Sequence, residues 1–343
     1  MGFRVKRSAA LFKCSWQVLK TDKTLALFPV ISAVATLLMA AAFLTPILSV
    51  PSLRSDAIEF VHDMEKDHQA LESEQSPGYD REDADTQAAI DDGTMATGET
   101  RPPAPKLSAM DIGFLIYGFA FFFCCSFVVI FFNAALVGAT NRKFEGEPTG
   151  VMVGLGIACQ RLPQILAWAL VNAIVGTILR ALEERMGAVG RIVIMVIGVA
   201  WSIATYFAIP TLVIEGVGPF KAVRNSVGAI KRTWGESLVI AIGFGCIGSI
   251  VTLLGVSALV AGAAIGVLFL SQERTAEAIA LGGTVASAGI VILILWSVLS
   301  STLMAITRTA LYRYAVDGVV PGGFDESALA SAFVDRKSGQ PAH

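Results

Sequence analysis

The sequence has few charged residues, and those it has are unevenly placed. Only 16% of its 343 residues are Asp, Glu, Lys or Arg, against about 25% in soluble domains, and the mean hydropathy is +0.65. A soluble core helix does not extend so far without charge as the uncharged runs of this chain, which excludes an ordinary soluble globular protein. These runs are 24–53, 112–141, 162–179, 192–214, 237–272 and 278–307.

The sequence also lacks the groups from which most catalytic and metal sites are built. Its three histidines lie outside the uncharged runs, and no P-loop, GxSxG, HExxH or dinucleotide-binding fingerprint occurs in a suitable context. Its five cysteines form no CxxC pair and lie in or beside apolar runs, as small buried hydrophobic residues do. No segment concentrates Lys and Arg as a nucleic-acid-binding surface does. We therefore expect a non-enzymatic protein with no catalytic residues, no cofactor, no metal site and no nucleic-acid partner.

Each uncharged run predicts a membrane-spanning helix. A hydrocarbon core needs about 20 apolar helical residues, and Arg180 can snorkel from the end of the shortest run. The runs are continuous rather than alternating, which favours helices over a barrel. The predicted fold class is all-α, a polytopic helical membrane protein with six transmembrane helices at 24–50, 112–140, 162–182, 190–214, 237–270 and 278–307. The helix over 237–270 would measure roughly 50 Å against a core of about 30 Å, so it must tilt, break or protrude.

In three further segments the spacing of apolar residues predicts amphipathic helices that lie in the membrane interface. They are 1–23, a stretch near 150–161 and a stretch near 219–233, and each precedes an odd-numbered span, which gives a weak internal repeat. In the clearest of them Phe220, Val223, Val227, Ile230 and Trp234 recur at helical spacing. The other faces carry cations, which are candidate contacts for anionic lipid headgroups: Lys221, Arg224, Lys231 and Arg232. The alternative for each segment is a surface helix packed on a protein core.

The distribution of charge predicts the orientation. Of the 26 Lys and Arg residues, 17 fall on the side that holds the termini, and cytoplasmic loops carry the excess of cations. We expect a multi-pass protein of the plasma membrane with a cytoplasmic N-terminus and a cytoplasmic tail over 316–343. The insertion 51–110 holds 14 of the 28 acidic residues and is predicted outside, helical to about Glu72 and disordered over 73–105. The other five spans form a membrane domain over 111–315.

Polar side chains inside or at the ends of the spans are the remaining candidate sites. Asn133 and Asn172 lie within spans, and Glu215 stands at the end of one, where it is expected to pair with Lys221, Arg224 or a neighbouring loop. Two functions stay open. One is an envelope-organising or accessory protein whose partners are membrane lipids, a second copy or a membrane protein. The alternative is a transporter of a small solute or lipid that uses a glycine-lined path between spans.

Several short motifs resemble one family. They are Phe28-Pro29, Asn133-Ala134-Ala135-Leu136, Pro210 with Val213-Ile214-Glu215-Gly216, Gly218-Pro219, Ser226, Trp234-Gly235-Glu236 and Tyr312-Arg313-Tyr314-Ala315 with Pro321-Gly322-Gly323-Phe324. Together they resemble the domain-of-unknown-function family 6159 of uncharacterised prokaryotic integral membrane proteins. The resemblance covers nearly the whole chain except the acidic insertion. It implies a polytopic helical membrane protein and adds no mechanism.

Overall fold

The computed structural model describes residues 2–74, 109–186, 188–232, 236–271, 273–322 and 324, and every regular element among them is helical. The predicted disorder over 73–105 lies outside these residues beyond Glu74, as does the tail beyond Phe324. In chain order the elements are α1 (Gly2–Thr21), the 3-10 helix η1 (Lys23–Ala26), α2 (Leu27–Ser49), α3 (Pro51–Glu74), α5 (Ala109–Phe144), α6 (Val151–Gln160), α7 (Leu162–Arg185), α8 (Ala188–Ala204), α9 (Ala208–Glu215), α10 (Pro219–Arg232), α11 (Glu236–Leu270), α12 (Thr275–Glu277), the π-helical turn η2 (Ala278–Gly282) and α13 (Gly283–Asp317).

Among the residues that the structure describes, six helical stretches are long and apolar enough to cross a membrane, and they overlap the uncharged runs of the sequence. They are Lys23–Ser49, Met110–Phe144, Leu162–Glu183, Gly190–Glu215, Gly248–Leu270 and Thr275–Asp317. Most of their large apolar side chains are exposed, for example Leu37, Met195 and Leu253. In water such exposure is costly, whereas lipid tails solvate these side chains as well as a protein interior does. The fold is therefore that of a helical membrane protein.

The chain divides into two compact units. Unit 1 comprises Met1–Ala35, Phe127–Ala169 and Trp201–His343, and unit 2 comprises Thr36–Ser126 and Leu170–Ala200. The boundaries fall inside α2, α5, α7 and α8, so these four helices contribute to both units. Unit 1 contains all the short helices near the predicted cytoplasmic side, and unit 2 contains α3.

The sequence predicted one uninterrupted span over 190–214, whereas the structure breaks this stretch between α8 and α9. The break falls at Thr205, Tyr206 and Phe207, where the backbone makes turns. A broken helix leaves backbone N–H groups without helical acceptors. Here the N–H of Phe207 donates to Oγ of Ser226 in α10 over 3.0 Å, and both residues are buried. The hydroxyl of Ser226 thus supports the break from a distant part of the sequence.

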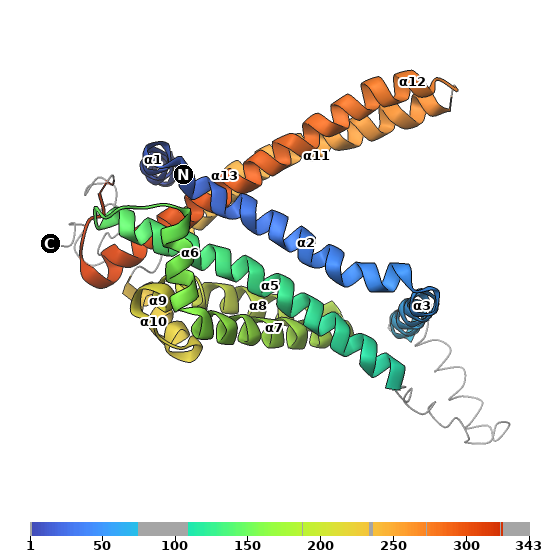
Figure 1. The fold of residues 1–343 in the computed structure, drawn as a ribbon, viewed down its shortest axis with the longest axis horizontal. Coiled ribbons are helices and arrows are strands. Elements are labelled where there is room, and N and C mark those ends of the chain that lie inside the picture. The colour runs from blue at the N-terminus through green and yellow to red at the C-terminus, as the bar shows by residue number, and fades with distance from the viewer. Residues whose placement is uncertain are drawn as a thin grey trace, which may run out of the picture. The chain divides into compact units, whose positions relative to one another are not determined.

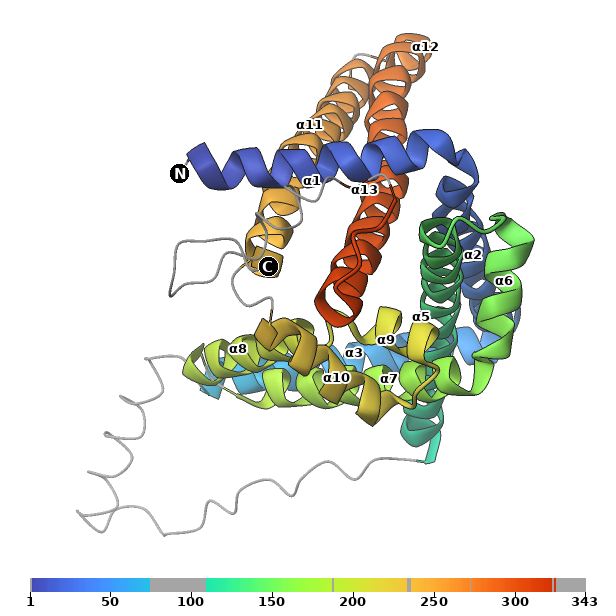
Figure 2. The ribbon, with the colours of Figure 1, turned by 90° about the vertical axis from the view of Figure 1, so that its left-hand side faces the viewer.

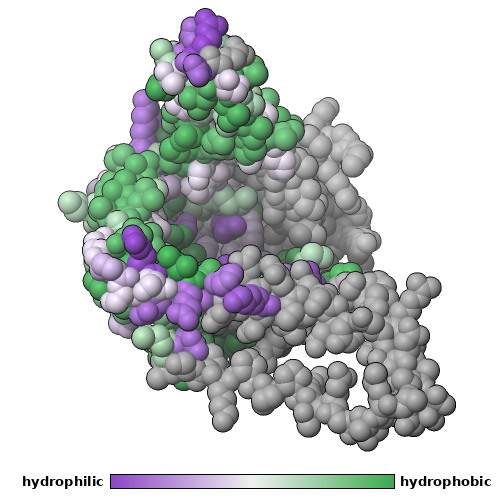
Figure 3. Space-filling view, turned by 90° about the vertical axis from the view of Figure 1, so that its right-hand side faces the viewer, coloured by the Kyte–Doolittle hydropathy of each residue, from purple (hydrophilic) through white to green (hydrophobic). Residues whose placement is uncertain are grey.

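The long run over 237–270 does not break at its glycines, because α11 is one continuous helix. It forms an antiparallel hairpin with α13, and α12 lies at its tip (Figure 1). Glycines bring the two backbones together: a Cβ on Gly262 would lie 2.4 Å from N of Ala286, and one on Gly289 would lie 2.7 Å from O of Gly255. Such small-residue contacts are the usual basis of helix packing in membranes. Apart from its hydrophilic tip, the visible surface of the hairpin is hydrophobic (Figure 3).

The helix α1 crosses the hairpin and packs against both α11 and α13 (Figure 2). Its buried face consists of Leu11, Cys14, Ser15, Val18 and Leu19. At its centre Oγ of Ser15 and Oγ1 of Thr307 in α13 share a buried hydrogen bond of 2.7 Å. The part of α1 from Leu11 to Leu19 therefore packs on protein through one face.

The helix α6 approaches its neighbours equally closely, through a glycine. A Cβ on Gly154 would lie 2.5 Å from Cζ of Phe28 and 2.6 Å from the carbonyl oxygen of Ala135. Phe28 and Ala135 are both fully buried. On the other side of α6, Met152 is 82% exposed. The helix thus packs through small residues and presents a large apolar side chain outward.

Candidate functional site

The polar groups of unit 1 gather around the C-terminal half of α13, and Glu215 is at the centre of the first group. Its carboxylate accepts hydrogen bonds from the buried hydroxyl of Tyr312 in α13 and from Nδ2 of Asn225 in α10, the latter over 2.6 Å. A carboxylate at a helix C-terminus is opposed by the helix dipole, and these donors offset that cost. The sequence predicted Lys221, Arg224 or a loop as partners. The contacts found join α9, α10 and α13 in one cluster, here called the Glu215 cluster: Glu215, Asn225 and Tyr312.

Gly216 ends α9 in the left-handed conformation, with φ of 67° and its N–H bonded to O of Leu212. A side chain at this position would be strained and would also strike the guanidinium of Arg161, whose Nη1 would lie 2.3 Å from a Cβ. The guanidinium therefore lies close to the backbone at the end of α9, where a cation is favoured by the helix dipole. Arg161 follows α6 directly, so this contact connects a second short helix to the Glu215 cluster.

A second arginine lies one turn before Tyr312 in α13. The guanidinium carbon of Arg308 stands 4.7 Å from the ring centroid of Tyr206, at the break between α8 and α9. Its buried Nε has no hydrogen-bond partner among the described residues. Cation–π contacts of this kind are worth about 0.5 to 2 kcal/mol, the larger values being for desolvated pairs. This cation–π contact joins the C-terminal half of α13 to the break between α8 and α9.

Another group of polar side chains lies at the C-terminal end of α5. Nη1 of Arg313 donates to Oε1 of Glu145 over 2.9 Å and to Oδ1 of Asn141 over 3.2 Å. Nδ2 of Asn141 also donates to Oε1 of Glu145 over 3.1 Å. Arg313 is only 17% exposed, while Glu145 is 37% exposed. A partly desolvated, multiply bonded pair like this contributes more to stability than an exposed one, so it fixes α5 to α13.

Asp22 connects the N-terminal helix to the loop after α5. Its carboxylate caps η1, accepting from N of Thr24 over 3.1 Å, and also accepts from the hydroxyl of Thr149. Nζ of Lys143 lies 3.9 Å away. Burial acts to raise the pKa of Asp22, but the hydrogen bonds from Thr149 and Thr24 and the charge of Lys143 outweigh it and lower the pKa below its usual value. Asp22 is thus held as a buried anion.

The predicted lipid contacts lie on the outer face of α10, which begins at Pro219 as expected. Its inner face, formed by Ala222, Ser226, Ala229 and Ile230, is buried, and α10 packs on α9 and α13. Phe220, Arg224 and Lys231 share one exposed strip of the opposite face, with Lys221 beside it, and Phe220 is 80% exposed. The backbone of Arg232 belongs to α10, but its side chain lies outside the described residues.

The two predicted intramembrane asparagines belong to different compact units. Asn133 lies in unit 1 and Asn172 in unit 2, and both are half-buried. The apolar pocket found in unit 2 is lined by neither of them. No group of three or more His, Cys, Asp and Glu among the described residues is placed to hold a metal ion.

Sequence reasoning missed most of the residues that organise this end of unit 1. The sequence patterns assign no role to Asn225, Arg161 or Asp22, and Tyr312 enters only through a motif of the family resemblance. One signal did point here. The motifs that carried the family resemblance meet in space: Phe28 and Ala135 meet at Gly154, Ser226 meets the α8–α9 break, Tyr312 meets Glu215, and Phe324 packs edge-on against Phe144 at 5.9 Å.

Comparison with known proteins gives one match. Residues 112–323 match the model of the family of unknown function DUF6159. No curated protein matches the chain. No solved structure matches it. The match covers more than half of the chain and begins after the acidic insertion, so it includes α5 to α13 and excludes α1, α2 and α3.

Proposed function

On the premise that the chain belongs to the family of unknown function DUF6159, we propose that it is a non-enzymatic, multi-pass protein of the plasma membrane that organises the envelope or serves as an accessory subunit. Its six apolar helices cross the bilayer with both termini in the cytoplasm. Membrane lipids are its partners, and anionic headgroups bind the outer face of α10. The proposal of a non-enzymatic role is supported by the lack of catalytic motifs in the sequence.

One observation carries the lipid-binding part of this proposal. Phe220, Arg224 and Lys231 lie on the same exposed strip of α10, while the opposite face of the helix is fixed on α9 and α13. An interfacial helix needs an aromatic or apolar side chain that enters the acyl region and cations that reach the phosphates. Packing on protein alone does not explain why Phe220 is 80% exposed beside cations, because an exposed large apolar side chain is costly in water.

The same arrangement recurs more weakly in the other two short helices. Met152 of α6 is 82% exposed while Gly154 and Ala158 are buried. In α1 the half-buried Trp16 has Nζ of Lys20 5.7 Å from its ring centroid. These features support three helices that pack on unit 1 through one face and meet the cytoplasmic membrane surface through another.

Charge reversal tests the proposal. The variant Lys221→Glu, Arg224→Glu and Lys231→Glu should retain far less phosphatidylglycerol than the wild type when bound lipids are counted by native mass spectrometry. Each cation near an anionic surface contributes about 1 kcal/mol, so the affinity should fall by roughly a hundredfold or more. Retention of zwitterionic phosphatidylethanolamine should stay the same.

The matched control reverses three exposed cations on the predicted outer side, in the variant Arg54→Glu, Lys66→Glu and Arg274→Glu. It should bind phosphatidylglycerol as the wild type does. Equal loss in both variants would indicate a general charge effect, and no loss in the α10 variant would refute the assignment of α10 as the lipid contact.

A further inference from the structure

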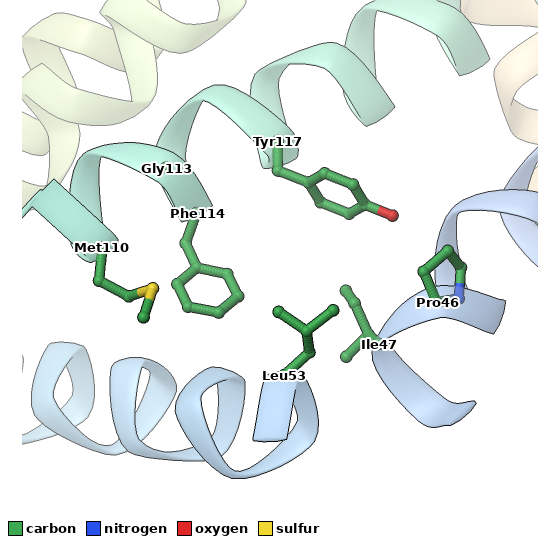
Figure 4. A pocket seen from close by; sticks show the side chains of 7 residues that line it. All are labelled: Pro46, Ile47, Leu53, Met110, Gly113, Phe114 and Tyr117. Atoms are coloured by element: carbon green, nitrogen blue, oxygen red, sulfur yellow. The ribbon is translucent and has the colours of Figure 1, made fainter. Parts of the chain in front are cut away.

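Unit 2 contains an apolar pocket between its helices α2, α3 and α5. Its volume is about 230 Å³, and the side chains of α2, α3 and α5 point into it (Figure 4). The lining residues are Pro46, Ile47, Leu53, Met110, Gly113, Phe114 and Tyr117.

Two residues explain why helices leave a hollow here. Pro46 lies inside α2, where its ring removes one backbone hydrogen bond and forces the preceding turn aside. Gly113 provides no side chain, and a Cβ built on it would meet nothing within 4 Å. Across the gap, the hydroxyl of Tyr117 donates to the carbonyl oxygen of Phe43 over 2.5 Å, in the turn of α2 before Pro46. The polar atom of the lining is therefore already engaged, and the remaining surface is hydrocarbon.

The helix α3 closes one side of the pocket. It starts at Pro51, directly after α2, and runs across the axis of α2 instead of continuing it (Figures 1 and 2). The rings of Phe60 and Phe114 stack with centroids 5.3 Å apart, which holds α3 against the start of α5. Ile58 and Val61 nevertheless remain more than 60% exposed. A helix with these side chains that lies across the ends of two spans suits the surface of a bilayer.

We propose that this pocket holds the acyl chain of a bilayer lipid. The lining offers no free donor to a polar ligand, and an apolar cavity of only about 150 Å³ already excludes water and binds benzene. The pocket lies at the ends of the first two apolar stretches, Lys23–Ser49 and Met110–Phe144. The lining residues Leu53 and Met110 are 37% and 54% exposed, so the pocket is open at its surface. The hydrocarbon most abundant at such a depth is a lipid tail, which can enter sideways from the membrane.

This site is independent of the headgroup contacts proposed for α10. It lies in unit 2, uses a different part of the lipid and takes a zwitterionic lipid as readily as an anionic one. A single neutral probe can therefore test it without engaging the cations of α10.

The experiment uses the full chain in lipid nanodiscs that contain phosphatidylethanolamine with a photoreactive diazirine on one acyl chain. In the wild type we expect cross-links to concentrate on the peptide that includes Met110, Phe114 and Tyr117. The variant Gly113→Phe places a ring in the open space of the pocket and should reduce this labelling at least fivefold. Gly118→Phe is the matched control, because Gly118 is on the same helix, has the same open space within 4 Å and does not line the pocket.

Equal labelling of the Gly113→Phe and Gly118→Phe variants would overturn the proposal, because it would show annular lipid only. Absence of concentrated labelling in the wild type would overturn it as well. If Gly113→Phe does not fold, as judged by its helical circular dichroism and thermal transition, the smaller variant Gly113→Leu replaces it with the same expected direction. Loss of phosphatidylglycerol binding in the α10 variant would not change any of these outcomes.

Discussion

Asp22 shows how one side chain can hold several segments of this protein together. Its carboxylate is 9% exposed, contacts Thr24 and Thr149 by hydrogen bonds and lies 3.9 Å from Nζ of Lys143. These donors favour the charged form more than burial disfavours it, so the pKa is lowered. A group with a lowered folded-state pKa stabilises the fold above its unfolded-state pKa, which is about 3.9. This contribution is lost as the pH falls through the folded-state value.

The variant Asp22→Asn should therefore be less stable than the wild type at pH 7 by about 1.5 to 3 kcal/mol, the usual contribution of hydrogen bonds to a charged group. The difference should shrink as the pH falls below about 4, because the wild-type carboxyl becomes neutral too. Thermal unfolding in detergent, followed by circular dichroism across this range, measures it. Glu59→Gln, a change at an exposed carboxylate of α3, provides the control. A difference that stayed constant with pH would contradict this account.

Gly154 is the residue where α6 approaches α5 and the start of α2 most closely. The variant Gly154→Ala would place a methyl group 2.6 Å from the carbonyl oxygen of Ala135, which cannot move without its helix. We expect a loss of about 1 to 3 kcal/mol from overpacking. Gly156→Ala in the same helix meets nothing within 4 Å and should be neutral or stabilising by up to about 1 kcal/mol. Paired thermal unfolding curves check this, and equal melting temperatures would show that the contact is not tight.

At the scale of single helices, the sequence predicted which segments are helical, but its large apolar residues do not mark the face of α10 that packs on protein. Phe220, Val223 and Val227 defined the apolar face expected to lie in the membrane interface, whereas the face that packs on protein is centred on Ala222, Ser226 and Ala229. Small residues contribute little to a hydrophobic pattern, although they permit the closest helix contacts. The face that packs on protein therefore lies to one side of the predicted apolar face, and Phe220 is left exposed.

The break between α8 and α9 has one local signal, which the apolar periodicity of the stretch does not show. The stretch is apolar on both sides of Tyr206, but in a continuous helix Pro210 would lack the N–H that bonds to the carbonyl group of Tyr206 and would clash with that group; in the structure Pro210 lies in the first turn of α9, where proline is tolerated. The group that satisfies the freed N–H of Phe207 is Ser226, which lies in the next short helix. Because such support comes from tertiary contacts, a reading of local periodicity cannot find it. The same holds for the Glu215 cluster, whose three members come from three helices.

The hairpin of α11 and α13 gives a prediction about an element. The variant Gly262→Val would bring side-chain atoms against N of Ala286 and O of Gly282, at 2.4 and 2.7 Å from the Cβ. The helices should move apart toward the usual separation of about 8 to 10 Å. Gly266→Val adds the same residue one turn later, where a Cβ meets nothing within 4 Å, and should leave the hairpin unchanged.

Spin labels at the exposed positions Leu253 and Ile294 would report this movement as an increase in distance on the order of 2 Å in the Gly262→Val variant. A labelled Gly266→Val protein should retain the wild-type distance. Identical distances in all three proteins would mean that the glycine contacts do not set the separation of the helices.

At the scale of the whole molecule, the distribution of cations predicts the orientation in the membrane. The sequence places 17 of 26 cations on the side of the termini, and in unit 1 two of these contact helix ends: Arg161 lies at the end of α9 and Arg313 at the end of α5. The side chains of Arg161 and Arg313 therefore contact protein groups rather than lipid headgroups alone. Such residues still oppose translocation during insertion, because the bias acts on charge before the fold is complete. The predicted topology thus does not depend on whether these cations finally contact lipid or protein.

Two exposed positions allow a direct test of this orientation in a chain whose five cysteines are replaced. Ser271 lies just after α11, and Glu147 lies in the loop between α5 and α6, where its surface ion pair with Arg142 is worth little. We expect Ser271→Cys to react with a membrane-impermeant maleimide in intact cells. Glu147→Cys should react only after the membrane is permeabilised, because the positive-inside bias puts this loop in the cytoplasm. The reverse pattern would invert the topology, and it would also place α10, with its exposed Phe220 and cations, on the outer surface.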